Sequence, residues 1–200
     1  MNKVRVAIVI AVLTLLVVVG FRLKANASSP VPSLEKMLLR ESDLRGKVSW
    51  AENGNLKGED AASMASFIGL PLRNSVETGI SYFTACVGGG AECTPGSIAE
   101  GLYRYRTAKD AELAMDEAMS NLSGSRLGTV SILSRHEVVR EGVKGRMVKA
   151  SDPAGEACWF VGRSGCTVIV VVSVGSKEFG TEKLLDAVLP VLARRVGKAR

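Results

Sequence analysis

The chain has few of the residues on which catalytic sites are built. It contains one histidine, four cysteines and only 5% aromatic residues among its 200 positions. The single histidine, His136, lies in the sequence Ser134-Arg135-His136-Glu137, and no serine stands in a G-x-S-x-G motif. Because a serine-hydrolase triad needs an imidazole beside its nucleophile, this chemistry is disfavoured. We interpret His136 as a surface residue near a strand end.

Motifs for phosphate and metal binding are also lacking. Gly88-Gly89-Gly90 is followed by Ala91-Glu92-Cys93, whereas a P-loop continues with Gly-Lys-Ser/Thr at the start of a helix. The cysteine spacings C-x6-C and C-x7-C do not match the short knuckles of zinc sites. No pair of acids is singled out by its spacing. The sequence therefore predicts no catalytic residue, no cofactor and no metal site.

Most of the excess positive charge lies at the N-terminus. Residues 1–27 hold four of the 26 cations and none of the 20 acids, so 22 cations face 20 acids in the rest. A near-neutral body predicts no nucleic-acid partner. Tyr103 and Tyr105 alternate with two arginines and could stack bases. Alternation along a strand also places such rings in a core, and we favour that interpretation.

A long apolar stretch stands near the N-terminus. Val6 to Phe21 carries no charge, and two cations lie on each side of it. Ala25-Asn26-Ala27 offers the small-x-small site of a cleaved signal peptide. Arg22 and Lys24 lie between this site and the apolar stretch, which is unusual in a signal peptide. The apolar stretch of 16 residues is only slightly too short to span a bilayer. Residues 1–27 are thus either a signal peptide or a membrane anchor, followed by a tether at 28–32 and an extracytoplasmic domain at 33–200.

All four cysteines lie in the predicted domain. An even number in an exported chain predicts two disulfides, for which three connectivities are possible. We expect the local pairs Cys86–Cys93 and Cys158–Cys166. The second pair would bridge a hairpin whose turn is centred on Gly162. With the leader, these cysteines predict a body outside the cytoplasm, either anchored to the membrane or secreted.

Hydrophobic periodicity predicts an α+β fold. Apolar residues recur at helical spacing over Ala108–Leu122 and Thr181–Val196, and shorter helices are expected at Leu34–Arg40 and Ala61–Ile68. The stretch Thr167–Val172 is continuously apolar, which is typical of a central strand covered on both faces. We expect one domain with a mainly antiparallel sheet of five or six strands, both long helices packed on one face, and an N-terminal apolar helix.

Two stretches of the domain carry a resemblance. Gly101 to Ala111 reads as a strand that leads into a helix through a short polar turn. Cys158 to Arg163 leads to Val168–Val174 and then to a closing helix. Together they resemble the extracytoplasmic sensor domains of bacterial membrane Ser/Thr kinases and related exported proteins. The resemblance implies an α+β domain with two disulfides that binds an envelope ligand, and it assigns no functional residue.

Three functions follow as hypotheses. The first is a non-enzymatic module that binds a ligand or partner of the cell envelope. Its apolar pocket is expected around Trp50, Tyr82 or Trp159. The second is an exported hydrolase, which needs paired carboxylates in a cleft. The third is an accessory subunit of a membrane complex, which needs an exposed apolar patch.

The C-terminus carries a small basic cluster. We interpret these cations as partners of the dipole of the last helix, with contact to anionic lipid as the alternative. The cluster comprises Arg194, Arg195, Lys198 and Arg200.

Overall fold

The computed structural model describes residues 32–53, 75–87, 94–123, 131–152 and 155–198. The predicted leader with its apolar helix, the predicted helix Ala61–Ile68 and Cys93 lie outside these residues. Ser33–Arg200 forms one compact unit. Within the described residues, every helix is too short or too polar to cross a bilayer.

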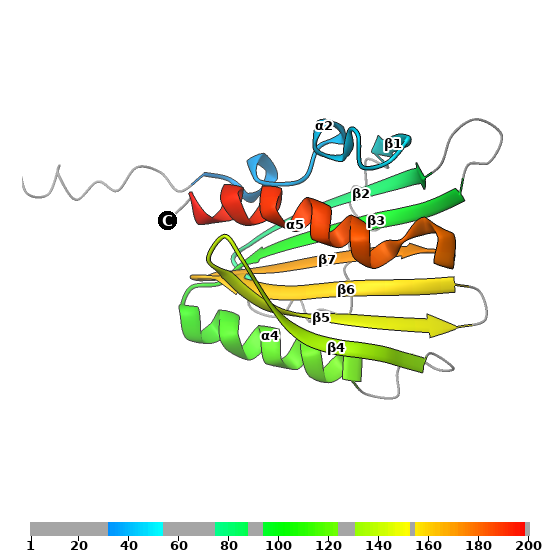
Figure 1. Ribbon diagram of the computed structural model, residues 1–200. Helices are drawn as coiled ribbons and strands as arrows, with labels where there is room; N and C mark the ends of the chain where they lie inside the picture. Colours follow the sequence, from blue (N-terminus) through cyan, green and yellow to red (C-terminus); the bar gives the residue numbers. More distant parts are fainter. Residues whose placement is uncertain (1–31, 54–74, 88–93, 124–130, 153–154, 199–200) are drawn as a thin grey trace, which may run out of the picture. The chain divides into compact units, whose positions relative to one another are not determined.

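One antiparallel sheet of seven strands organises the described residues (Figure 1). Its order is β1-β2-β3-β7-β6-β5-β4, and each pair of neighbours is antiparallel. The α+β class with an antiparallel sheet is therefore confirmed, with at least one strand more than expected. The strands are β1 Trp50–Asn53, β2 Glu77–Val87, β3 Thr94–Arg104, β4 Ser131–Arg140, β5 Val143–Asp152, β6 Gly155–Ser164 and β7 Thr167–Gly175.

The apolar strand β7 lies at the centre of the sheet, as its sequence predicts. Every side chain from Thr167 to Ser173 is buried. Val168, Val170 and Val172 point into one half of the core, whereas Ile169 and Val171 point into the other. A strand without polar alternation needs cover on both faces, and the fold supplies it.

The two long helices lie on opposite faces of the sheet, so the prediction that both pack on one face is wrong. Helix α4 (Ala108–Ser123) covers the face with Val168, and helix α5 (Thr181–Gly197) covers the face with Ile169. Figure 1 shows α5 lying over one face of the sheet. The reason is the double-sided β7, because two helices on one face would leave its other face open to water.

The helices use different side chains to reach the sheet. Helix α4 presents small residues, among them Ala111, Ala114 and Ala118. Its start is capped because the Thr107 hydroxyl accepts the Asp110 N–H at 3.1 Å and donates to the Asp110 carboxylate at 2.7 Å. Helix α5 presents larger aliphatic residues and continues through Pro190, and its buried members include Leu184, Leu185, Val188, Leu189 and Leu192.

The chain that follows Pro32 packs against the α5 face. The predicted helix Leu34–Arg40 is only a 3-10 turn, η1 (Leu34–Lys36), followed by the short helix α2 (Glu41–Leu44). Apolar side chains anchor this segment in the core, namely Leu34, Met37, Leu39 and Leu44. A second 3-10 turn, η3 (Lys177–Phe179), connects β7 to α5.

The turn between β6 and β7 overturns one predicted disulfide. Ser164 pairs with Thr167, so the turn is Gly165-Cys166, with Gly165 at φ +58°. Six residues separate Cys158 from this turn, and Cys158 faces Ser173. The two cysteines are therefore at different distances from the turn and do not face each other, and both are free thiols. The predicted Cys158–Cys166 bridge is wrong.

The glycine that was expected to form this turn lies inside β6 instead. A Cβ at Gly162 would come within 2.4 Å of the Phe160 ring, a distance that carbon atoms do not tolerate. Gly162 is thus present because the ring of its neighbour crosses above it, and not because the backbone turns there.

Candidate functional site

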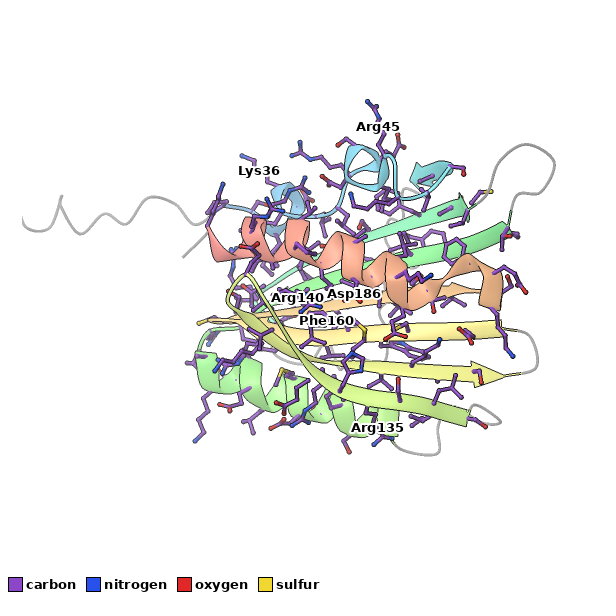
Figure 2. The ribbon with its side chains drawn as sticks, in the orientation of Figure 1. Lys36, Arg45, Arg135, Arg140, Phe160 and Asp186 are labelled. Carbon is purple, nitrogen blue, oxygen red and sulfur yellow. The ribbon has the colours of Figure 1, made fainter. Side chains whose placement is uncertain are left out.

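An open groove of about 570 Å³ lies between α4 and the end strand β4. Its wall is mostly charged and comes from α4, β4 and β5. Figure 2 labels Arg135, which comes from β4, the strand at this end of the sheet. The lining residues are Asp116, Met119, Ser120, Arg135, His136, Glu137 and Arg146.

The strand register places two arginines in this groove. Arg135 faces Val148 and Glu137 faces Arg146, so Arg135 and Arg146 are diagonal neighbours on the α4 face. Diagonal neighbours lie within reach of long side chains. Glu137 and Arg146 are exposed, and their carboxylate and Nε atoms are 4.0 Å apart. Because a guanidinium can bind a carboxylate or phosphate through two parallel hydrogen bonds, the two arginines can hold one anionic group.

His136 is exposed, which confirms the surface interpretation. It lies in the middle of β4 and not near its end, because β4 runs from Ser131 to Arg140. Its strand neighbours Arg135 and Glu137 also line the groove.

A second cavity, of about 610 Å³, lies at the start of α5. Lys149 lines it, and its ammonium is 3.0 Å from Glu156 and 3.9 Å from Glu182. The hydrogen bond to Glu156 and the charges of both acids raise the pKa of Lys149. Lys149 is thus paired with an acid of the protein itself at closer range than Arg146 is with Glu137 in the groove.

Glu100, on β3, is the one fully buried carboxyl group of the described residues. Its Oε2 accepts the Leu39 N–H at 2.7 Å and the Ser81 hydroxyl at 2.9 Å. Its Oε1 is buried without a partner. Burial raises the pKa of Glu100 to about 8, against the opposing effects of these hydrogen bonds and the Arg195 charge. The group is therefore largely protonated at neutral pH.

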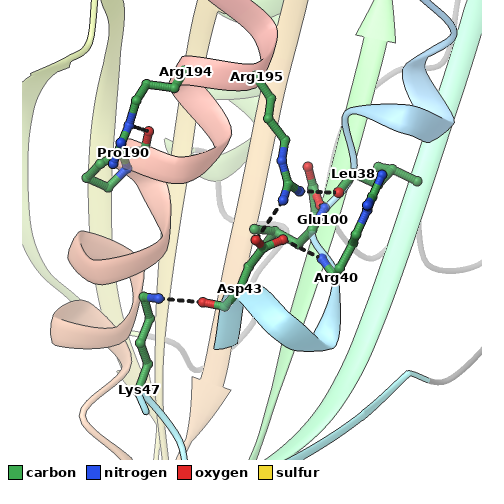
Figure 3. Close-up of polar contacts among 9 residues, drawn as sticks. Leu38, Arg40, Asp43, Lys47, Glu100, Pro190, Arg194 and Arg195 are labelled. Carbon is green, nitrogen blue, oxygen red and sulfur yellow. Dashed lines mark hydrogen bonds and ion pairs between the residues drawn. The ribbon is translucent and has the colours of Figure 1, made fainter. Parts of the chain in front are cut away.

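Arg195 of α5 completes the polar cluster around Glu100. Its guanidinium donates to the Leu38 carbonyl at 2.7 Å and to Asp43 Oδ1 at 2.6 Å (Figure 3). The Lys47 ammonium donates to the Asp43 carbonyl. Glu100 and Arg195 together attach the N-terminal segment to β3 and α5. Since Glu100 has no exposed surface and lines neither of the two larger cavities, we assign it a structural role.

The aromatic residues that were candidates for ligand binding belong mostly to the core. Trp159, Tyr103 and Tyr105 are buried beneath α4, which confirms the core interpretation of the tyrosine pair. Burial raises the pKa of Tyr103. Tyr82 is half-buried and its hydroxyl lies 2.9 Å from Ser97. The side chain of Trp50 lies outside what the structure describes.

The remaining cysteine and basic residues are placed as follows. Cys86 is disulfide-bonded, and its predicted partner Cys93 lies outside the described residues, so this pairing stays a prediction. Burial raises the pKa of Cys158 to about 12, which makes it an unreactive thiol. In the C-terminal basic cluster, Arg194 is exposed whereas Arg195 is part of the Glu100 cluster. No group of three or more His, Cys, Asp or Glu side chains that could hold a metal ion occurs in the described ranges.

Sequence reasoning missed both Glu100 and the groove. Glu100 had a signal, because it is a lone acid within the otherwise uncharged stretch Ile98–Tyr103 of a strand that is buried on both faces. The groove had none, because its lining comes from segments whose contact depends on the strand order.

Comparison with known proteins supports the fold. No family model matches the chain, and no curated protein matches it. Among solved structures, it is similar to the extracellular domain of PknH from Mycobacterium tuberculosis, with 10% identity and a TM-score of 0.52. The match covers 85% of this chain and 98% of that one. The resemblance to extracytoplasmic kinase sensor domains is thereby confirmed at the level of the fold.

Proposed function

We propose that the chain is an exported, non-enzymatic module that binds an anionic ligand of the cell envelope in the groove between α4 and β4. The observation that carries this proposal is the pair Arg135 and Arg146, which line one open groove from adjacent strands. Arginine suits this task because its charge is permanent and its planar group matches carboxylates and phosphates.

The location outside the cytoplasm rests on two supports. The leader 1–27 has the composition of an export signal or anchor. The described fold is also that of an extracellular domain. We propose accordingly that residues 1–27 deliver the domain 33–200 to the outer side of a membrane and, if uncleaved, keep it there.

Binding is favoured over hydrolysis by the positions of the acids. Asp116 and Glu137 line the groove but are exposed, whereas the general acid of a two-carboxylate hydrolase is held protonated in a desolvated place. Glu100 is the carboxyl that burial keeps protonated, and it lines neither larger cavity.

The test uses citrate and inorganic phosphate as probe anions. The full chain, purified in mild detergent, is titrated with each anion at constant ionic strength in a calorimeter. We expect saturable binding that weakens at least roughly ten-fold in Arg135→Ala/Arg146→Ala, because charge-assisted hydrogen bonds contribute about 1.5–3 kcal/mol each. Arg45→Ala, which removes an exposed arginine of the N-terminal segment, serves as the control and should bind like the parent.

Hydrogen exchange gives the location independently. Bound anion should slow amide exchange in peptides from β4 and α4 and leave β1 and β2 unchanged. Equal affinity in the parent and the double variant, or protection confined to other elements, would refute the groove as the binding site.

A further inference from the structure

We infer that β4 is a self-association edge, which pairs antiparallel with β4 of a second copy of this chain. This inference concerns contacts between copies and does not depend on the anion site. The strand stands at one end of the sheet, with β5 on its inner side and no described strand on its outer side (Figure 1). An unpaired edge presents a row of N–H and C=O groups that another strand can bind.

The side chains of β4 are unusually open for a strand of ten residues. Only Val138 is buried and Ser134 is half-buried, and the other eight residues are exposed. Three of them are apolar, with Leu133 53% and Val139 58% exposed, and Ile132 37%. Edge strands are usually protected by proline, charged side chains, bulges or a covering segment. Strand β4 contains no proline, its register shift lies at one end between Ile132 and Ser134, and its central charges, Arg135 and Glu137, are opposite in sign. Such a strand is suited to cover by a partner.

The hairpin turn determines which backbone groups point outward. Arg140 and Val143 flank the two-residue turn Glu141-Gly142, whose φ angles are +49° and +80°. In such a turn the flanking residues exchange their backbone hydrogen bonds. Because the pattern alternates along an antiparallel strand, the backbone groups at positions 135, 137 and 139 point away from β5. A second strand would therefore hydrogen-bond to these odd-numbered residues.

One register of two β4 strands is self-complementary. With the two-fold axis at His136, Arg135 lies opposite Glu137 of the second copy, and Glu137 lies opposite its Arg135. The exposed Leu133 of each copy also lies opposite Val139 of the other copy. Opposite charges and apolar pairs across strands each stabilise a sheet, and here every such pair occurs twice by symmetry.

The neighbouring registers are disfavoured by the same charges. An axis at residue 135 would place Arg135 opposite Arg135 of the second copy. An axis at residue 137 would place Glu137 opposite Glu137 of the second copy. Like charges directly opposite destabilise a strand pair. Regular pairing would end at Leu133, where the register with β5 shifts between Ile132 and Ser134. The charge pattern thus favours pairing with β4 of a second copy in one register.

The first test is a cross-link at the axis. In the proposed register His136 faces its own copy as a non-hydrogen-bonded pair, with Cα atoms about 4.5 Å apart, which is within the range of a disulfide. In a Cys166→Ser background, His136→Cys in the full chain should form a covalent dimer under mild oxidation in the membranes or medium of the expressing cells. Glu137→Cys is the matched control, since its two copies would lie roughly 8 Å apart and stay unlinked.

The second test is charge exchange, followed by sedimentation of the full chain in detergent without added anion. Arg135→Glu or Glu137→Arg alone turns two attractive pairs into two repulsive ones and should weaken dimerisation roughly ten-fold. The double exchange Arg135→Glu/Glu137→Arg should restore it. Any of three results would overturn the inference: both cysteine variants trap the dimer equally, the parent stays monomeric, or the double exchange folds but does not restore association.

Discussion

Replacing Glu100 by glutamine should remove most of a pH dependence that the buried carboxyl imposes on the fold. Glu100 is fully buried, and burial raises its pKa from the ordinary value of 4.5 to about 8. The unfolded chain releases this proton near pH 4.5, whereas the folded chain keeps it until about pH 8. Between these values the folded state binds more protons, so stability falls as pH rises.

The size of the effect follows from the same interval. Each pKa unit corresponds to 1.36 kcal/mol, so the stabilising contribution that is complete below pH 4.5 and lost by pH 8 is at most about 5 kcal/mol. This is comparable to the whole stability of a small domain. Glutamine cannot ionise, and its amide can still accept the Leu39 N–H and the Ser81 hydroxyl. Glu100→Gln should therefore be more stable than the parent at pH 8 and show little of the slope.

Urea unfolding of the full chain between pH 5 and pH 8.5 measures this prediction, with fluorescence of the buried Trp159 as the signal. The difference between the parent and Glu100→Gln isolates the contribution of this carboxyl. Glu112→Gln is the control, because that side chain is exposed on α4 and its replacement should leave the slope unchanged. A Glu100→Gln protein with the parental slope would refute the reasoning, as would a parent whose stability rises over this range.

Three further outcomes are expected. Arg195→Ala should lose about 1–3 kcal/mol of unfolding free energy by denaturant titration, because the Leu38 carbonyl and Asp43 Oδ1 lose their guanidinium donor, whereas Arg194→Ala beside it should change little. Alkylation followed by peptide mass spectrometry should modify Cys166 in the native protein and Cys158 only after unfolding, and a Cys158–Cys166 disulfide would contradict this structure. Gly145→Ala should destabilise the fold by more than about 1 kcal/mol in thermal unfolding, since its Cβ would lie 2.5 Å from the Val161 carbonyl oxygen, and unchanged stability would contradict that packing.

The groove and the β4 edge lie at the same end of the sheet and have different roles. The groove faces α4 and depends on Arg135 and Arg146, whereas self-association depends on the outward backbone groups of β4 and on Arg135 with Glu137. A two-fold axis perpendicular to the sheet would leave both grooves open on the same side. The anion titration and the cross-linking test read out these two roles separately.

Local patterns in the sequence were sufficient for the two long helices and the central strand. Helices α4 and α5 begin and end within about one residue of their predicted limits, and β7 is central and doubly covered as its apolar run predicts. These features depend on periodicity and capping over neighbouring residues, which the sequence carries directly. The short helix expected at Leu34–Arg40 was less accurate, because contacts with a distant strand and with α5 hold that segment.

Features that depend on non-local packing could be decided only by the tertiary structure. The opposite placement of α4 and α5 follows from the need to cover both faces of β7. The position of the β6–β7 turn, and with it the failure of the Cys158–Cys166 pairing, follows from a strand register that one glycine could not predict. The groove and the β4 edge arise from the strand order. Sequence by itself thus determined the two long helices and the central strand, and contacts between distant segments decided which side chains meet, because register and face are set by the whole core.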